Sequence, residues 1–394
     1  MKRLFKFPFS HLVFALVVFT SLGCSKKTTT SYTPPPSGGG GGTNPNPPVW
    51  DVNALRGVWV TTAASNALDS RDNIKLTVQN CKAAGINNIF MVVYNNARTM
   101  YPSAVMNNLI GKSISERFAG RDPLQEMITE AHAVGIKVHA WFEYGFASSF
   151  SANGGPIVAA KPNWAAKDIN GNLVVKNQFD WLNAFDPEVQ NFMISLFKEV
   201  INNYAVDGVQ GDDRLPAVPS SSGYDTYTVN LYKSENGGSN PPTNALDAGW
   251  ISWRSKKLTA FLKRLRTEVK TLKPSIQFTM SPSAHPFALN EYLQDWPAWV
   301  DSSFVDAIMP QCYRYDIAAY NATIAQQKSF YKNPSVPFYP GVLLKAGTNL
   351  ASDLYLTQMI QTNRTNGFKG ECFFFYEGIR DKPAFFKDQY PYIK

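Results

Sequence analysis

The sequence predicts a (β/α)8 TIM barrel, a closed ring of parallel strands surrounded by helices. The first observation is that short apolar or β-branched runs alternate with helical patterns from Leu55 onward. Strict alternation implies right-handed crossovers and a parallel sheet. The second observation is that eight such units fit into about 340 residues, which suits a closed barrel better than an open sheet. We therefore expect one (β/α)8 domain over residues 51–394.

The expected strands are short runs rich in apolar, β-branched or aromatic residues. They cover residues 56–61, 88–94, 137–142, 208–212, 276–280, 305–311, 338–344 and 372–376. Helical patterns lie between them, at 73–84, 123–134, 187–204, 253–272 and 351–365. Two long insertions, 145–183 and 214–248, each follow a strand. In a barrel this places them at the C-terminal face, where active sites are built.

The N-terminus has the pattern of an export signal. Three cations within the first six residues precede the apolar run 12–19, and small residues follow up to Gly23 and Cys24. The run is shorter than the roughly 18 residues that span a bilayer, so we do not expect a permanent transmembrane helix. A Cys directly after Leu22 and Gly23 resembles the bacterial lipoprotein signal, which is cleaved before an acylated cysteine. Residues 1–23 are the expected signal peptide.

Residues 24–50 are predicted to form the acylated Cys24 and a disordered linker. The stretch 25–48 is rich in Ser, Thr, Pro and Gly and has too few apolar residues to offset chain entropy. A lipid on Cys24 would place the domain in the bacterial cell envelope, attached to the outer membrane and facing the periplasm. Plain secretion is the alternative interpretation.

Charge and cysteine content exclude several classes of protein. The formal net charge is +8, but five Lys or Arg residues precede residue 51, where there is no acid, which leaves +3 for residues 51–394. No basic block typical of nucleic-acid binding remains. Cys81, Cys312 and Cys372 lie in apolar contexts, as buried structural cysteines do. No Cys or His spacing suggests a metal, and we expect no cofactor.

Six stretches of the chain resemble segments of one known protein family. They are LRGVWVTT (55–62), MYPS (100–103), DPLQEMITEAHAVGIKVHAWFE (122–143), the span from WLNAFDPEV to DGVQGDD (181–213), VDAIMPQCY (305–313) and GECFFFYEG (370–378). In this order they resemble the glycosyl-hydrolase-like family 10, formerly uncharacterised family 187, from about residue 54 to near the C-terminus. The resemblance implies a (β/α)8 glycosidase-type domain of bacterial envelope proteins, for some of which hydrolysis of peptidoglycan-type glycans has been suggested.

The chain departs from the family pattern after the fourth strand. Where many relatives carry HFDDYFYP, this sequence has QGDDRLPA, so that Gln210 replaces His and Arg214 replaces Tyr. We expect Arg214 to contact the substrate differently from the family's residue.

Carboxylates at strand ends are the candidates for catalysis. Cleavage of a glycosidic bond needs one carboxylic acid to protonate the leaving oxygen and a second carboxylate as nucleophile or base. Alternation along residues 137–142 places Glu143 in the barrel mouth. The same logic directs Asp212 inward, whereas Asp213 leaves the strand. On the last strand, Glu371, Phe373, Phe375 and Glu377 share a phase, and Glu377 is expected to end the strand.

We predict Asp212 as nucleophile or general base and either Glu143 or Glu377 as proton donor. Aromatic neighbours favour both donors equally, because burial raises a carboxyl pKa. The alternatives are turn capping or an Arg pair for Asp212, a structural or supporting role for Asp213, and salt bridges for the two glutamates to Arg56, Arg98 or Arg314.

Sugar binding needs aromatic faces and polar groups near these carboxylates. Trp59 is more typical of the core. Besides Arg214, the expected substrate-binding residues are Asn95, His139, Trp141, Tyr144, Gln210, His285, Gln311, Tyr313 and Tyr376.

Two other functions compete with hydrolysis. A barrel can bind a polysaccharide or peptidoglycan glycan without turnover, because the fold does not imply chemistry. An esterase or deacetylase would need a GxSxG elbow or a His-rich metal site. Neither is present, and the mature chain holds only His132, His139 and His285. Glycoside hydrolysis is therefore the leading prediction, with peptidoglycan as the favoured glycan.

Overall fold

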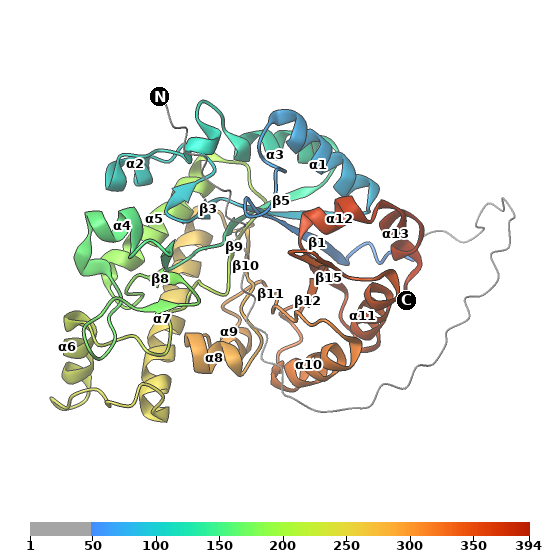
Figure 1. Ribbon diagram of the computed structural model, residues 1–394. Coiled ribbons are helices and arrows are strands. Elements are labelled where there is room, and N and C mark those ends of the chain that lie inside the picture. Colours follow the sequence, from blue (N-terminus) through green and yellow to red (C-terminus); the bar gives the residue numbers. More distant parts are fainter. Residues whose placement is uncertain (1–48) are drawn as a thin grey trace, which may run out of the picture.

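The computed structural model describes residues 49–394 (Figure 1). The predicted signal peptide, Cys24 and almost all of the predicted linker lie outside the described residues. In the described part, no helix is both long enough and apolar enough to cross a membrane.

Within residues 49–394, eight parallel strands form the main sheet. Its order is β11-β10-β9-β5-β2-β1-β15-β12, and isolated parallel bridges join Ile308 to Phe338 and Gln311 to Gly341. These bridges close the sheet between β11 and β12, so the predicted (β/α)8 barrel is confirmed. The strands are β1 (Leu55–Val60), β2 (Asn88–Val92), β5 (Lys137–Phe142), β9 (Gly208–Gly211), β10 (Gln277–Met280), β11 (Ala307–Ile308), β12 (Gly341–Leu343) and β15 (Gly370–Phe374).

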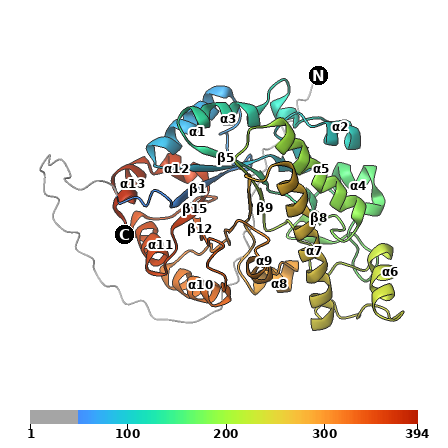
Figure 2. The same cartoon turned by 180° about the vertical axis from the view of Figure 1, so that it is seen from behind.

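Helices surround the strands on all sides, as the views from the front and from behind show (Figures 1 and 2). The longer helices are α1 (Arg71–Ala83), α3 (Pro123–Ala133), α5 (Pro187–Asn203), α6 (Thr226–Glu235), α7 (Ala248–Leu272), α10 (Ile317–Phe330) and α11 (Asp353–Thr365). The short ones are α2 (Ala104–Ile110), α4 (Gly155–Ala160), α8 (Phe287–Tyr292), α9 (Trp296–Asp301), α12 (Tyr376–Asp381), α13 (Pro383–Asp388), and the 3-10 turns η1 (Glu116–Phe118), η2 (Pro162–Trp164) and η3 (Tyr390–Tyr392).

Local sequence explains where the helices begin. Asp122 and Asp186 each cap a helix whose first residue is proline, and each side chain accepts a backbone N–H of the first turn. Helix α10 was not predicted, because its buried face includes the polar Thr323 and Gln327 and so lacks a clear apolar period.

The predicted insertions lie at the C-terminal ends of the strands. The first contains a small antiparallel sheet of β6 (Ala147–Phe150), β8 (Phe179–Trp181) and β7 (Val175–Lys176), and the second contains α6. Two hairpins, β3 with β4 (Tyr94–Asn95 and Arg98–Thr99) and β13 with β14 (Lys345–Ala346 and Asn349–Leu350), stand on other strand ends.

Aromatic rings fill the barrel interior. Trp59 lies 6.1 Å from Phe90, 6.3 Å from Trp141 and 6.4 Å from Phe374 between ring centroids, so Trp59 is a core residue as expected. Phe374 is therefore the inward residue of β15, whereas Phe373 packs outward against Phe386. Glu371 and Phe373, which share a phase, thus face the helices. Both faces of a barrel strand are buried, so the apolar pattern does not show which phase faces inward.

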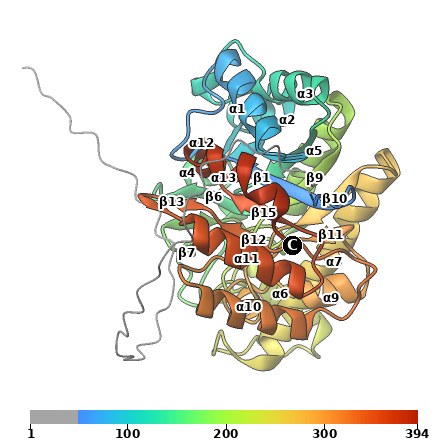
Figure 3. The ribbon, with the colours of Figure 1, turned by 90° about the vertical axis from the view of Figure 1, so that its right-hand side faces the viewer.

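The chain enters the barrel at the end opposite to these insertions. The Val49 N–H donates to the Pro391 carbonyl at 2.8 Å, and Trp50 makes an edge contact with Tyr390 at 4.9 Å. The guanidinium of Arg56 lies 4.1 Å above the Trp50 ring. Figure 3 views the molecule from the side near the C-terminus, with α1 and α10 on opposite sides of the strands.

Candidate active site

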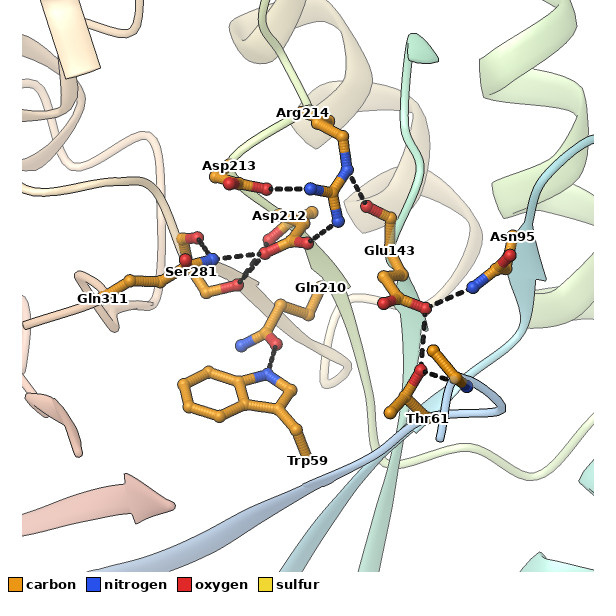
Figure 4. A network of polar contacts seen from close by, with 12 residues as sticks. Trp59, Thr61, Asn95, Glu143, Gln210, Asp212, Asp213, Arg214, Ser281 and Gln311 are labelled. Carbon is orange, nitrogen blue, oxygen red and sulfur yellow. Dashed lines mark hydrogen bonds and ion pairs between the residues drawn. The ribbon is translucent and has the colours of Figure 1, made fainter. Parts of the chain in front are cut away.

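Glu143 is the first residue after β5, and its side chain is 2% exposed. Its Oε2 accepts hydrogen bonds from Asn95 Nδ2 at 2.6 Å and from Thr61 Oγ1 at 3.0 Å. Oε1 accepts none from the described residues, yet it is not among the atoms that are sealed from solvent (Figure 4). Both donors are neutral, and the second oxygen of this buried carboxyl group has no hydrogen-bond donor among the described residues.

Asp212 is the first residue after β9 and is equally buried. Its Oδ1 accepts from Gln311 Nε2 at 2.7 Å and from Ser281 Oγ at 3.2 Å. Its Oδ2 accepts from Arg214 Nη2 at 2.9 Å, and its backbone carbonyl accepts from Gln294 at 3.1 Å. Segments after three different strands thus hold this carboxylate in one orientation (Figure 4).

Arg214 connects the two carboxyl-bearing strands. Besides Asp212, it pairs with Asp213 through Nη1 at 3.0 Å, and its Nε donates to the backbone carbonyl of Glu143 at 2.9 Å. Its guanidinium lies 4.8 Å from the ring centroid of Phe179 and 5.5 Å from that of Tyr144. The cation therefore contacts the Asp212 carboxylate, but only the main chain of Glu143.

Burial dominates the electrostatics of both carboxyl groups. It raises the pKa of Glu143, and Arg214, Asn95 and Thr61 oppose the rise. Burial and the charge of Asp213 raise the pKa of Asp212 well above its usual range, again against Arg214. Perturbed carboxyl groups that face a common opening are typical of catalytic sites.

Of the predicted residues, Asn95, Asp213, Arg214 and Gln311 lie in this cluster. Tyr144 covers Arg214, and Tyr313 makes an edge contact with Trp59 at 6.5 Å below the mouth. Sequence reasoning missed the donors Thr61, Ser281 and Gln294 and the ring of Phe179. Thr61 and Ser281 could have been found, because each is the first residue after a strand, as Glu143 and Asp212 are.

The predicted strand-end position of Glu377 was wrong. Glu377 lies in the first turn of α12, because the chain turns into a helix directly after Phe375. Its carboxylate accepts from Ser65 Oγ at 2.6 Å and pairs with Arg380 at 2.6 Å. Tyr376 points away from the mouth, since its hydroxyl accepts a hydrogen bond from Asn80 of α1 at 3.0 Å.

His139 points into the barrel, as predicted, but it does not reach the mouth. It precedes Glu143 by four residues, roughly 13 Å along a strand. Its ring stacks on Phe90 at 4.5 Å, and its Nε2 lies 2.8 Å from Asn88 Oδ1. Burial lowers its pKa to about 4, so it is a neutral core histidine at physiological pH.

Trp141 and Gln210 also belong to the interior. Trp141 is 2% exposed and packs against Trp59. The Gln210 amide accepts from Trp59 Nε1 at 2.7 Å and donates to Thr279 Oγ1 at 3.2 Å. Because these contacts occupy the buried amide, Gln210 lies below the mouth as part of the packed interior, and its predicted contact with a sugar does not fit this position.

His285 is directed toward the helices. Its ring lies 4.4 Å from Phe330 and 6.1 Å from Trp296, and Gln327 binds its backbone N–H and carbonyl. Its predicted substrate contact does not fit this position, because the loop after β10 folds back onto α9 and α10.

The described residues contain no group of three or more His, Cys, Asp or Glu side chains that could hold a metal ion. Cys81, Cys312 and Cys372 are free and buried in this part of the chain.

A closed barrel with two buried, strand-end carboxyl groups at one mouth defines a glycoside-hydrolase-type protein. Sequence comparison agrees: the chain belongs to the glycosyl hydrolase-like 10 family, whose sequence profile matches residues 54–348. The predicted enzyme class, a glycosidase, is confirmed at this level.

Two relatives bear on the class. Glycosyl hydrolase DigH of Escherichia coli K12 is 28% identical over 316 residues, which cover 67% of this chain and 68% of that protein. Glycosyl hydrolase YngK of Bacillus subtilis is 21% identical over 384 residues, which cover 86% of this chain and 70% of that protein.

Solved structures show the same fold. The PgaB (BpsB) glycoside hydrolase domain of Bordetella bronchiseptica matches with a TM-score of 0.62 at 13% identity, covering 84% of this chain and 97% of that one. The β-amylase catalytic domain of Paenibacillus polymyxa matches with a TM-score of 0.60 at 11% identity, covering 82% and 92%.

Proposed function

We propose that the protein hydrolyses O-glycosidic bonds of a glycan, with Glu143 as general acid and Asp212 as nucleophile or general base. The observation that carries this proposal is the pair of buried carboxyl groups on neighbouring strands, of which only Asp212 has a charged partner. Such a pair supplies the two functions that glycoside hydrolysis requires.

Glu143 suits the acid role better than Glu377. Its Oε2 receives two neutral donors, its Oε1 is open, and burial raises its pKa toward a working range near neutrality. In Glu377, by contrast, Ser65 contacts Oε1 and Arg380 contacts Oε2, so both carboxylate oxygens already have a partner.

Asp212 suits the role of the ionised partner. Although burial raises its pKa, the three groups that contact its oxygens all donate hydrogen bonds, and one of them is a cation. A protonated Asp212 would direct its own O–H into this set of donors. This set of donors therefore favours the ionised carboxylate.

A peptidoglycan-type glycan is the substrate that we favour, and another envelope or dietary polysaccharide is the alternative. The predicted export signal and the family resemblance support the first choice. The second candidate function is glycan binding without turnover, and the three hydrogen bonds that already occupy Asp212 favour it.

The test uses the full chain with Cys24→Ser, incubated with purified peptidoglycan strands and a panel of polysaccharides. Mass spectrometry should detect fragments from the otherwise native chain that Glu143→Gln and Asp212→Asn fail to release. Glu268→Gln, on the outer helix α7 beside Lys198, is the matched control and should retain release. Binding without release by every variant would replace the hydrolase proposal with the binding function.

We also propose that Cys24 carries a lipid that holds the protein in the cell envelope. Because Val49 and Trp50 dock at the N-terminal end of the barrel, the linker would join the domain opposite its mouth. The open site would then face away from the membrane. Incorporation of labelled fatty acid that Cys24→Ser abolishes would support this location, and unchanged membrane fractionation of Cys24→Ser would contradict it.

A further inference from the structure

The proposed catalytic centre contains the guanidinium of Arg214 and three acidic side chains, those of Glu143, Asp212 and Asp213. Arg214 contacts these three residues in different ways. Arg214 donates to the Asp212 carboxylate at 2.9 Å and forms an ion pair with Asp213 at 3.0 Å. Toward Glu143 it offers only Nε, which binds the backbone carbonyl. All three nitrogen positions of the guanidinium are thus engaged, and none contacts the Glu143 carboxyl group (Figure 4).

The surroundings of Arg214 hold it in this orientation. The rings of Tyr144 and Phe179 pack near the guanidinium, and the Arg214 side chain is only 13% exposed. The Arg214 carbonyl accepts the Phe146 N–H at 2.9 Å, and a Cβ at Gly145 would lie 2.3 Å from that carbonyl. Gly145, with φ of +50°, therefore allows the β5 loop to pack directly on Arg214.

We propose that Arg214 is the positioning residue that assigns the two roles, because it keeps Asp212 ionised and leaves the proton on Glu143. The proposal rests on the proposed function for its catalytic meaning, but the charge assignment is a property of the protein alone. Burial by itself disfavours ionisation of both groups. A guanidinium that contacts only one of them removes this symmetry.

Other charged groups near the pair do not produce the same asymmetry. Asp212 faces Asp213 from its own loop, Glu143 from β5 and the Tyr313 hydroxyl after β11. Glu143 faces Asp212, Asp213 and the Tyr144 hydroxyl. These groups are acidic and disfavour ionisation of both carboxyl groups, Asp213 most strongly at Asp212. Arg214 lowers the pKa of both groups, but it donates a hydrogen bond only to the carboxylate of Asp212, and this contact distinguishes the two.

The test measures each protonation state directly, on the full chain with Cys24→Ser. Carbon-13 labelling of aspartate and glutamate side chains allows the carboxyl signals to be followed by NMR or infrared spectroscopy as a function of pH. Asp212→Asn and Glu143→Gln assign the two signals by their loss. We expect an ionised Asp212 and a protonated Glu143 near neutral pH.

Arg214→Gln should raise the pH at which Asp212 titrates by about 1 to 3 units, whereas Arg214→Lys should restore most of the effect. Arg380→Gln is the matched control, because it removes a guanidinium from Glu377 and should leave Asp212 unchanged. An unchanged Asp212 titration in a folded Arg214→Gln chain would overturn the proposal. So would a protonated Asp212 beside an ionised Glu143 in the otherwise native chain.

Activity gives a separate readout. If the chain hydrolyses a glycan, Arg214→Gln should move the acidic limb of the kcat profile to higher pH, and Arg214→Lys should move it less. If no glycan is cleaved but the spectroscopic shift is found, the hydrolase function fails while the charge assignment stands.

Discussion

Two buried glutamates at opposite ends of the barrel show how the same side chain serves different purposes. Glu371, near the start of β15, accepts two hydrogen bonds from Arg364, at 2.8 and 2.9 Å, one from the Tyr390 hydroxyl at 2.6 Å and one from Asn363 at 3.3 Å. Glu143, directly after β5, has two neutral donors and an open oxygen. Neither side chain is more than 2% exposed.

The contrast lies in what each carboxyl group still lacks. Glu371 is saturated by a cation and two neutral donors, which ties β15 to α11 and η3. Glu143 keeps an unused oxygen and no ionic partner at its carboxyl group, which leaves it able to hold and transfer a proton. Burial alone therefore does not distinguish the two glutamates, whereas the hydrogen-bonding capacity that remains at each carboxyl group does.

The largest effect is expected at the open end. Glu143→Gln should lower kcat by about 100-fold to 10,000-fold on a cleavable glycan, because the amide cannot protonate the leaving oxygen. Steady-state kinetics on the fragment-release assay would measure this. Full activity in the folded variant would show that Glu143 is not the general acid. The difference in hydrogen bonding between Glu143 and Glu371 would then have no catalytic consequence.

The opposite end should respond in stability. Glu371→Gln should reduce the free energy of unfolding by about 2 to 3 kcal/mol, because it leaves the largely buried guanidinium of Arg364 without a counterion. Denaturant unfolding measures the change, and kcat at moderate temperature should stay near its original value. A loss of stability as small in Glu371→Gln as in Glu143→Gln would contradict the structural role.

The pH dependence of stability should sharpen the comparison. Burial raises the pKa of Glu143 above its unfolded value, so its contribution to stability is present below the unfolded pKa and is lost as pH rises through the folded one. The free energy of unfolding of Glu143→Gln, relative to the native chain, should therefore rise as the pH increases above about 4. Thermal unfolding across this range is the measurement, and a constant difference would show that Glu143 is not desolvated.

The smallest effect is expected for Tyr390→Phe. This change removes one hydrogen bond to Glu371 but leaves Arg364 in place, so the loss should be about 1 kcal/mol. Denaturant unfolding should resolve it, with Tyr392→Phe on the same 3-10 turn as the control. A loss as large as that of Glu371→Gln would mean that the Tyr390 hydroxyl, and not the ion pair, dominates the network.

Much of the barrel could be predicted from the sequence because strands and helices have different apolar periods. The predicted strand 137–142 coincides with β5, and the position of Glu143 directly after it followed from counting. Asp212 was expected as the last residue of strand 208–212 and is the first residue after β9, a difference of one position. The same counting failed for Glu377, because a helix begins at Tyr376 and the sequence has no capping residue that would signal it.

The sequence by itself determined the alternation of elements, the closed parallel barrel and the positions of Glu143 and Asp212 at the ends of their strands. These follow from periodicity and from the rule that parallel strands end on one face. Tertiary structure decided which acidic groups share a cation and which remain open. Gln311 lies 99 residues from Asp212 in the chain yet binds its carboxylate. The orientation of the Arg214 guanidinium decides that it contacts the carboxylates of Asp212 and Asp213 and only the main chain of Glu143. Such contacts depend on how distant segments pack, and local sequence periods do not record that packing.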